Sequence, residues 1–113
     1  MTALERLTAI CEMLDDASYQ PKGDHVIFRR KRKVFAYFLN DHHGDGIVSV
    51  CVKVLPGDNE RLIQSDAKRF YSPAYIGSRG WVAYRLDEPK PDWSEVKELV
   101  KGSHQLTQQP STP

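Results

Sequence analysis

Three runs of aromatic and β-branched residues limit the possible folds of this chain more strongly than any other feature. They cover residues 25–28, 34–39 and 47–54, and only short polar links separate them. In the third run valines alternate with Ser, Cys and Lys, which is the period of a strand with one buried face. Parallel strands need a long crossover, so strands joined by such short links pair antiparallel. The sequence therefore predicts an α+β fold with an antiparallel sheet, not a doubly wound parallel one.

Amphipathic helices are predicted near both ends of the chain. Residues 2–14 repeat an apolar residue every three or four positions, and Thr2 with Glu5 forms a capping box. The same apolar spacing follows Asp92, which is expected to cap a last helix that ends at Gly102.

The middle of the chain predicts shorter elements. Asp58 is expected to cap a short helix that ends at Ser65. Residues 70–80 are aromatic but interrupted by Pro and Gly, which indicates an ordered loop, and residues 81–86 predict one more strand. The whole is an antiparallel sheet of about four to five strands, with the N-terminal, short middle and C-terminal helices packed on it.

The length of 113 residues suits one domain, which we expect to cover residues 1–104. Residues 105–113 are mainly Gln, Thr, Ser and Pro, a composition that predicts a disordered tail. Cys11 and Cys51 lie in apolar runs without metal or redox spacing, so buried free thiols are expected. A bridge between them would need their Cα atoms to come within reach.

The N-terminal residues lack the charged and then apolar layout of a signal peptide, and no apolar run approaches the length of a membrane span. These features predict a cytoplasmic protein without membrane contact.

Several short motifs follow one another along the chain: Lys33-Val34-Phe35-Ala36, the strand ending in Lys53, Pro73-Ala74-Tyr75, Gly80-Trp81-Val82, and Leu99 followed by Ser103-His104. Taken in this order they resemble the MmcQ/YjbR family. The resemblance implies a helix, an antiparallel sheet of about five strands and closing helices. Members are commonly labelled DNA-binding because of a proposed double-wing surface of β-hairpins, and no catalytic residue set carries over. The family's last helix usually ends in a Ser-Tyr pair, and here His104 takes the place of the tyrosine.

Five consecutive cations lie at the tip of the predicted hairpin: Arg29, Arg30, Lys31, Arg32 and Lys33. Strand alternation would place the first, third and fifth on one face and the other two on the opposite face. Such a wing could contact DNA phosphates, with Arg79 adding charge from a second loop. The alternative is a solvated tip that discourages edge pairing. The formal net charge of only +1 argues against a strong, dedicated nucleic-acid binder.

A second candidate site is a pocket for a small anionic or planar ligand, lined by Lys53, Tyr75, Arg79 and Trp81. The alternative, which we favour, is a secondary core in which the aromatic residues anchor the loop. A third possibility is a protein-interaction domain that uses an open sheet face or edge.

The sequence supports neither a metal site nor an enzyme. His42 and His43 are adjacent in a turn, where their side chains point apart, and no second pair has ligand spacing. No nucleophile motif or carboxylate pair stands out. We therefore expect a non-catalytic binding module without a cofactor.

Overall fold

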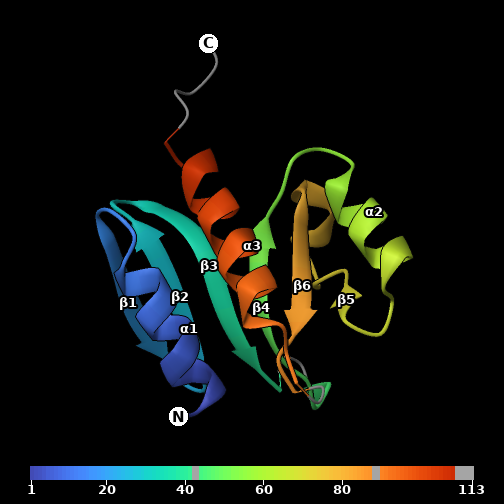
Figure 1. Ribbon diagram of the computed structural model, residues 1–113, viewed down its shortest axis with the longest axis horizontal. Coiled ribbons are helices and arrows are strands. Elements are labelled where there is room, and N and C mark those ends of the chain that lie inside the picture. The colour runs from blue at the N-terminus through green and yellow to red at the C-terminus, as the bar shows by residue number, and fades with distance from the viewer. Residues whose placement is uncertain (42–43, 88–89, 109–113) are drawn as a thin grey trace.

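The computed structural model shown in Figure 1 describes residues 1–41, 44–87 and 90–108. Along the chain, four strands follow the first helix, and shorter elements connect them to a last strand and a last helix within the described residues. The elements are α1 (Ala3–Glu12), β1 (Ala17–Lys22), β2 (His25–Arg30), β3 (Lys33–Asn40), β4 (Val48–Lys53), α2 (Asp58–Ser65), β5 (Phe70–Tyr71), the 3-10 helix η2 (Gly77–Arg79), β6 (Trp81–Arg85) and α3 (Trp93–Leu106).

All the strands form one antiparallel sheet of six strands in the order β1-β2-β3-β4-β6-β5. Helix α3 crosses the middle of one face, with α1 beside it over β1 and β2 and α2 next to β6 and β5 (Figure 1). The α+β prediction is confirmed, but the expected four to five strands were too few.

The two strands that the sequence did not reveal lie at the edges of the sheet. In β1 five of the six residues are exposed, so the apolar alternation that marks a half-buried strand is missing. Pro21 is tolerated there because an edge strand leaves one side of its backbone unpaired. Strand β5 has only two residues, too few to show a period.

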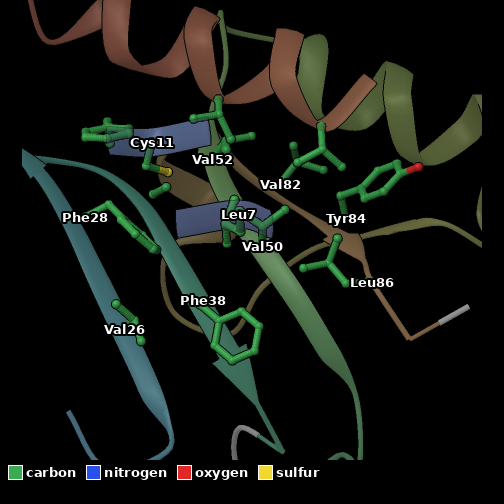
Figure 2. Packing of buried hydrophobic residues seen from close by; sticks show 14 of the residues in the cluster. Leu7, Cys11, Val26, Phe28, Phe38, Val50, Val52, Val82, Tyr84 and Leu86 are labelled. Atoms are coloured by element: carbon green, nitrogen blue, oxygen red, sulfur yellow. The ribbon is translucent and has the colours of Figure 1, made fainter. Parts of the chain in front are cut away.

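The main core fills the space between the helices and the sheet. Leu7 and Cys11 of α1 point onto the sheet, where they meet Phe28 and the valines of β4 and β6 (Figure 2). Tyr84 is also fully buried, and its hydroxyl accepts a hydrogen bond from the Asp92 backbone N–H at 3.0 Å. Burial of these side chains supplies most of the driving force for folding.

A β-bulge interrupts the pairing of β2 with β3. Phe28 pairs with Ala36, whereas Arg29 pairs with Val34, so Phe35 is an extra residue on β3. Phe35 and Ala36 are consequently both buried in the main core, although they are consecutive residues of one strand.

The helix ends follow the predicted caps only in part. The Thr2–Glu5 capping box is present, and the Asp92 side chain accepts from two backbone N–H groups of α3. Gly57 occupies the N-cap position of α2, so Asp58 is its first residue and not its cap. Gly102 does not end α3.

Helix α3 continues to Leu106, and Thr107 behind it is buried, so ordered structure extends past the expected boundary at residue 104. The predicted disorder of residues 109–113 falls outside the described residues. Among the helices of the described segments, none has the length and apolar character needed to cross a bilayer.

Candidate nucleic-acid interface

The basic segment forms the turn between β2 and β3, as predicted. Lys31 and Arg32 connect the two strands, and Lys31 adopts a left-handed backbone conformation with φ of 57°. Its N–H donates to the Asp16 carbonyl oxygen at 3.2 Å, which ties the turn to the start of β1. The side chains of Lys31, Arg32 and Lys33 are exposed.

Arg30 differs from its neighbours because its guanidinium is engaged within the protein. Nε donates to Thr107 Oγ1 and an Nη2 hydrogen to the Thr107 carbonyl oxygen, both at 2.9 Å. The third nitrogen, Nη1, lies 3.9 Å from Oδ2 of Asp16, and the Arg30 side chain is only 16% exposed. Arg30 therefore holds the end of α3 against the hairpin, and we leave it out of the interface.

The two faces of the hairpin do not carry the cations in the expected alternation. Arg30 pairs with Lys33 across the turn, so these two side chains leave the sheet on the same side. Arg29 pairs with Val34 and lies on the opposite face, where its Nη1 donates to Gln20 Oε1 at 2.7 Å. The expectation that Arg29 and Lys33 share a face is wrong, because the two-residue turn sets Arg30 opposite Lys33.

The sheet brings two further cations to the end where the hairpin turns. Because β3 and β4 are antiparallel, Lys53 at the end of β4 lies beside the beginning of β3. Lys53 pairs with Trp81 at the start of β6, and the Val54 N–H donates to the Gly80 carbonyl at 2.9 Å. Arg79 therefore reaches the same end of the sheet, which is the upper edge in Figure 1.

We call the exposed and half-exposed cations along this end of the sheet the cationic edge. From β2 to β6 the edge spans three strand spacings, about 14 Å. Asp16 at this end lies within ion-pairing distance of Arg30. The edge consists of Arg29, Lys31, Arg32, Lys33, Lys53 and Arg79.

The residues of the alternative ligand pocket lie in different surroundings. Trp81 is 9% exposed and packs against Tyr37 with ring centroids 5.3 Å apart, in a second apolar cluster on the face of the sheet away from the helices. Tyr75 is 82% exposed and lines a hollow of about 200 Å³ together with Tyr37. Neither Lys53 nor Trp81 lines this hollow. Trp81 and Tyr71 thus belong to a second apolar cluster under the loop, whereas Tyr75 lies outside it.

A buried polar pair lies within this second cluster. The hydroxyls of Ser49 and Tyr71 are 2.8 Å apart, and burial raises the pKa of the Tyr71 phenol to about 12, although the Ser49 hydrogen bond acts in the opposite direction. Tyr71 thus remains protonated at neutral pH and serves the structure of the loop.

Chemistry based on thiols or metals finds no support in the geometry. Cys11 and Cys51 are buried and free, and burial raises the pKa of each thiol to about 12, which removes the reactive thiolate. No group of three potential ligands could hold a metal ion within residues 1–41, 44–87 and 90–108. His42 and His43 lie outside the described residues.

The profile of the YjbR family matches residues 9–106, nearly the whole described chain. The chain belongs to the YjbR family. A Deinococcus radiodurans protein with a DUF419 domain is 21% identical, with a TM-score of 0.77 over 100% of this chain and 83% of that protein. A Pseudomonas syringae protein is 18% identical, with a TM-score of 0.73 over 95% and 99% of the two chains. These structures share the fold, and none of the curated proteins matches.

The Ser-His pair that marked the YjbR resemblance braces the cationic edge. Ser103 Oγ donates to the Phe35 carbonyl oxygen at 2.6 Å and accepts from the Lys53 N–H at 3.0 Å, joining β3 to β4 just beyond their last pair, Ala36 with Val52. His104 Nε2 donates to the Asp15 carbonyl oxygen at 2.7 Å, and its ring packs edge-on against Phe35. In the sequence these residues were recognised only as features of the family. Their role in joining the strands to α3 becomes visible only in the folded structure.

Proposed function

We propose that this YjbR domain binds nucleic acid through the cationic edge, by contacts to phosphates and without marked sequence specificity. The observation that carries the proposal is the sheet register. It places Lys53 and Arg79 at the end of the sheet where the hairpin presents Lys31, Arg32 and Lys33. We further propose a cytoplasmic location, as the sequence predicts.

The dimensions of the edge suit a nucleic-acid backbone. One strand of B-DNA carries a phosphate about every 3.4 Å along the axis, so about 14 Å corresponds to roughly four phosphates. Lys and Arg side chains on such a row neutralise phosphates and release counterions, which favours association. Their mutual repulsion in the free protein is relieved at the same time.

The bracing of the edge supports the same proposal. Arg30, Ser103 and His104 join the hairpin, β4 and the start of β1 to the last turn of α3. A surface held in this way loses little conformational freedom on binding. The formal net charge of +1 provides little long-range attraction, so the proposed affinity is moderate and sensitive to salt.

Fluorescence anisotropy with labelled duplex and single-stranded DNA at low salt tests the proposal. The variant Lys31→Ala/Arg32→Ala/Lys53→Ala removes three edge cations, and Lys22→Ala/Lys68→Ala/Lys97→Ala removes three exposed cations elsewhere. We expect the first variant to bind at least about tenfold more weakly and the second to bind like the wild type. If both variants lose DNA affinity equally, the attraction is not localised at the cationic edge. If both variants bind DNA like the wild type, the cationic edge is excluded as the binding site.

A further inference from the structure

A groove of about 470 Å³ lies between α3 and the connection that leads from β4 to Asp58, the first residue of α2, and we call it the α2–α3 groove. Its volume is within the range of ligand-binding clefts. The floor and walls are mainly apolar, and Leu55 at the rim remains 56% exposed. Leu55 is continuous with the other apolar residues of the groove, and contiguous apolar surface is what marks interaction sites. The apolar lining consists of Val54, Leu55, Leu99 and Leu106.

Gly102 provides a second, independent observation at this groove. It lies inside α3, where glycine is the least favourable residue after proline. Its backbone is not left-handed, and a Cβ atom added there would meet nothing within 4 Å. Neither the packing nor the conformation of the protein therefore explains a glycine. A methyl group would project into the groove, so the glycine keeps the groove open and lets another backbone approach α3 closely.

The charged residues around the groove indicate which kind of partner it can bind. Asp58, Glu95 and Glu98 line it together with the cation Lys53. Asp58 is paired with Arg61 at 3.0 Å. The two glutamates lie on exposed positions of α3, one turn apart. The rim is therefore acidic, and it complements a cationic occupant.

The shape of the groove favours an elongated occupant. The lining residues of α3 run from Glu95 to Leu106, which is about 16 Å along the helix axis. This length corresponds to about three helical turns, and an apolar groove of this length can receive the apolar face of an amphipathic helix.

We propose that the α2–α3 groove binds a short amphipathic helix of a partner protein, with apolar residues facing Gly102 and Lys or Arg on the flanks facing Glu95 and Glu98. The inference goes beyond nucleic-acid binding and does not depend on it.

A displayed library of random peptides supplies the probe for this site. The library is selected against the wild type and against Gly102→Leu, whose side chain would occupy the part of the groove beside residue 102. We expect enriched peptides with apolar residues at helical spacing and flanking cations, and about tenfold weaker binding of these peptides to the Gly102→Leu variant. Lys101→Leu is the matched control, because it introduces the same side chain on the other side of α3.

The charge reversal Glu95→Lys/Glu98→Lys extends the test. It should shift the selection towards peptides with acidic flanks, and circular dichroism will show whether each variant remains folded. The proposal is overturned if the enriched peptides bind Gly102→Leu and the wild type equally. It is also overturned if the enriched peptides show no preference for cations, or if no peptides are enriched. If the wild type self-associates and Gly102→Leu abolishes this association, the occupant of the groove is a second copy of the chain. That result would also overturn the proposal.

Discussion

Arg30 and Arg32 are two residues apart in one basic run, yet the fold uses them differently. Arg30 donates two hydrogen bonds to Thr107, whereas Arg32 is exposed in the turn. Local sequence could not separate them, because the distinction depends on where α3 ends, 77 residues away from Arg30.

Replacing Arg30 should therefore affect stability, and replacing Arg32 should affect binding. Arg30→Ala removes the donors to the hydroxyl and the carbonyl oxygen of Thr107, the C-cap residue of α3, and we expect a loss of about 2 kcal/mol in the free energy of unfolding. Arg32→Ala should change that free energy by less than about 0.5 kcal/mol. Urea unfolding followed by circular dichroism measures both. Equal destabilisation by the two variants would contradict the bracing role of Arg30.

At the scale of elements, α3 carries a glycine that its own packing does not need. Gly102→Ala removes the entropic penalty of a helical glycine, and the added methyl meets nothing within 4 Å. We expect the free energy of unfolding to rise by about 0.5–1 kcal/mol. Thermal or urea unfolding checks this, and a destabilised variant would show that the space beside Gly102 is not free.

The elements that sequence predicted correctly are those whose pattern arises locally. The alternating valines of β4 and the apolar stripes of α1 and α3 are readable because one face of each is buried. Strand β1 was missed because backbone pairing with β2 holds it in place, and such pairing leaves no side-chain pattern. The end of α3 was misplaced because contacts of Ser103, His104 and Thr107 with distant strands outweigh the tendency of Gly102 to end a helix.

Part of the candidate site was predictable from the sequence. The hairpin cations lie together in the sequence, so their turn was expected, and Arg79 was expected to add charge from a second loop. Lys53 lies beside the hairpin because β4 pairs with β3, and Arg79 lies there because β6 pairs with β4. The pairing of β6 with β4 cannot be read from local pattern.

At the scale of the whole molecule, three buried acids link stability to alkaline pH. Burial raises the pKa of the Cys11 and Cys51 thiols from 9.0 to about 12 and that of the Tyr71 phenol from 10.0 to about 12. Above pH 9 the unfolded chain releases these protons while the folded protein retains them, so stability decreases as the pH rises from about 9 to 12. Below that range their contribution is fully present.

Urea midpoints measured between about pH 7 and pH 11 test this linkage, with a decrease expected only in the alkaline half, above the ordinary thiol pKa of 9.0. The variant Cys11→Ala/Cys51→Ala should show a shallower decrease. If the wild type and this variant depend on pH equally, the thiols are not responsible.

The molecule as a whole is nearly neutral, with cations concentrated along one edge of its sheet. The most direct test of the proposed interface is the slope of log K against log salt concentration for binding to duplex DNA. About four phosphate contacts predict a slope near about −3.6 for the wild type. Lys31→Ala/Arg32→Ala/Lys53→Ala should reduce its magnitude by about 2 to 3, whereas Lys22→Ala/Lys68→Ala/Lys97→Ala should leave it unchanged. A slope that is the same in all three proteins, or the absence of binding at low salt, would contradict the proposed nucleic-acid interface.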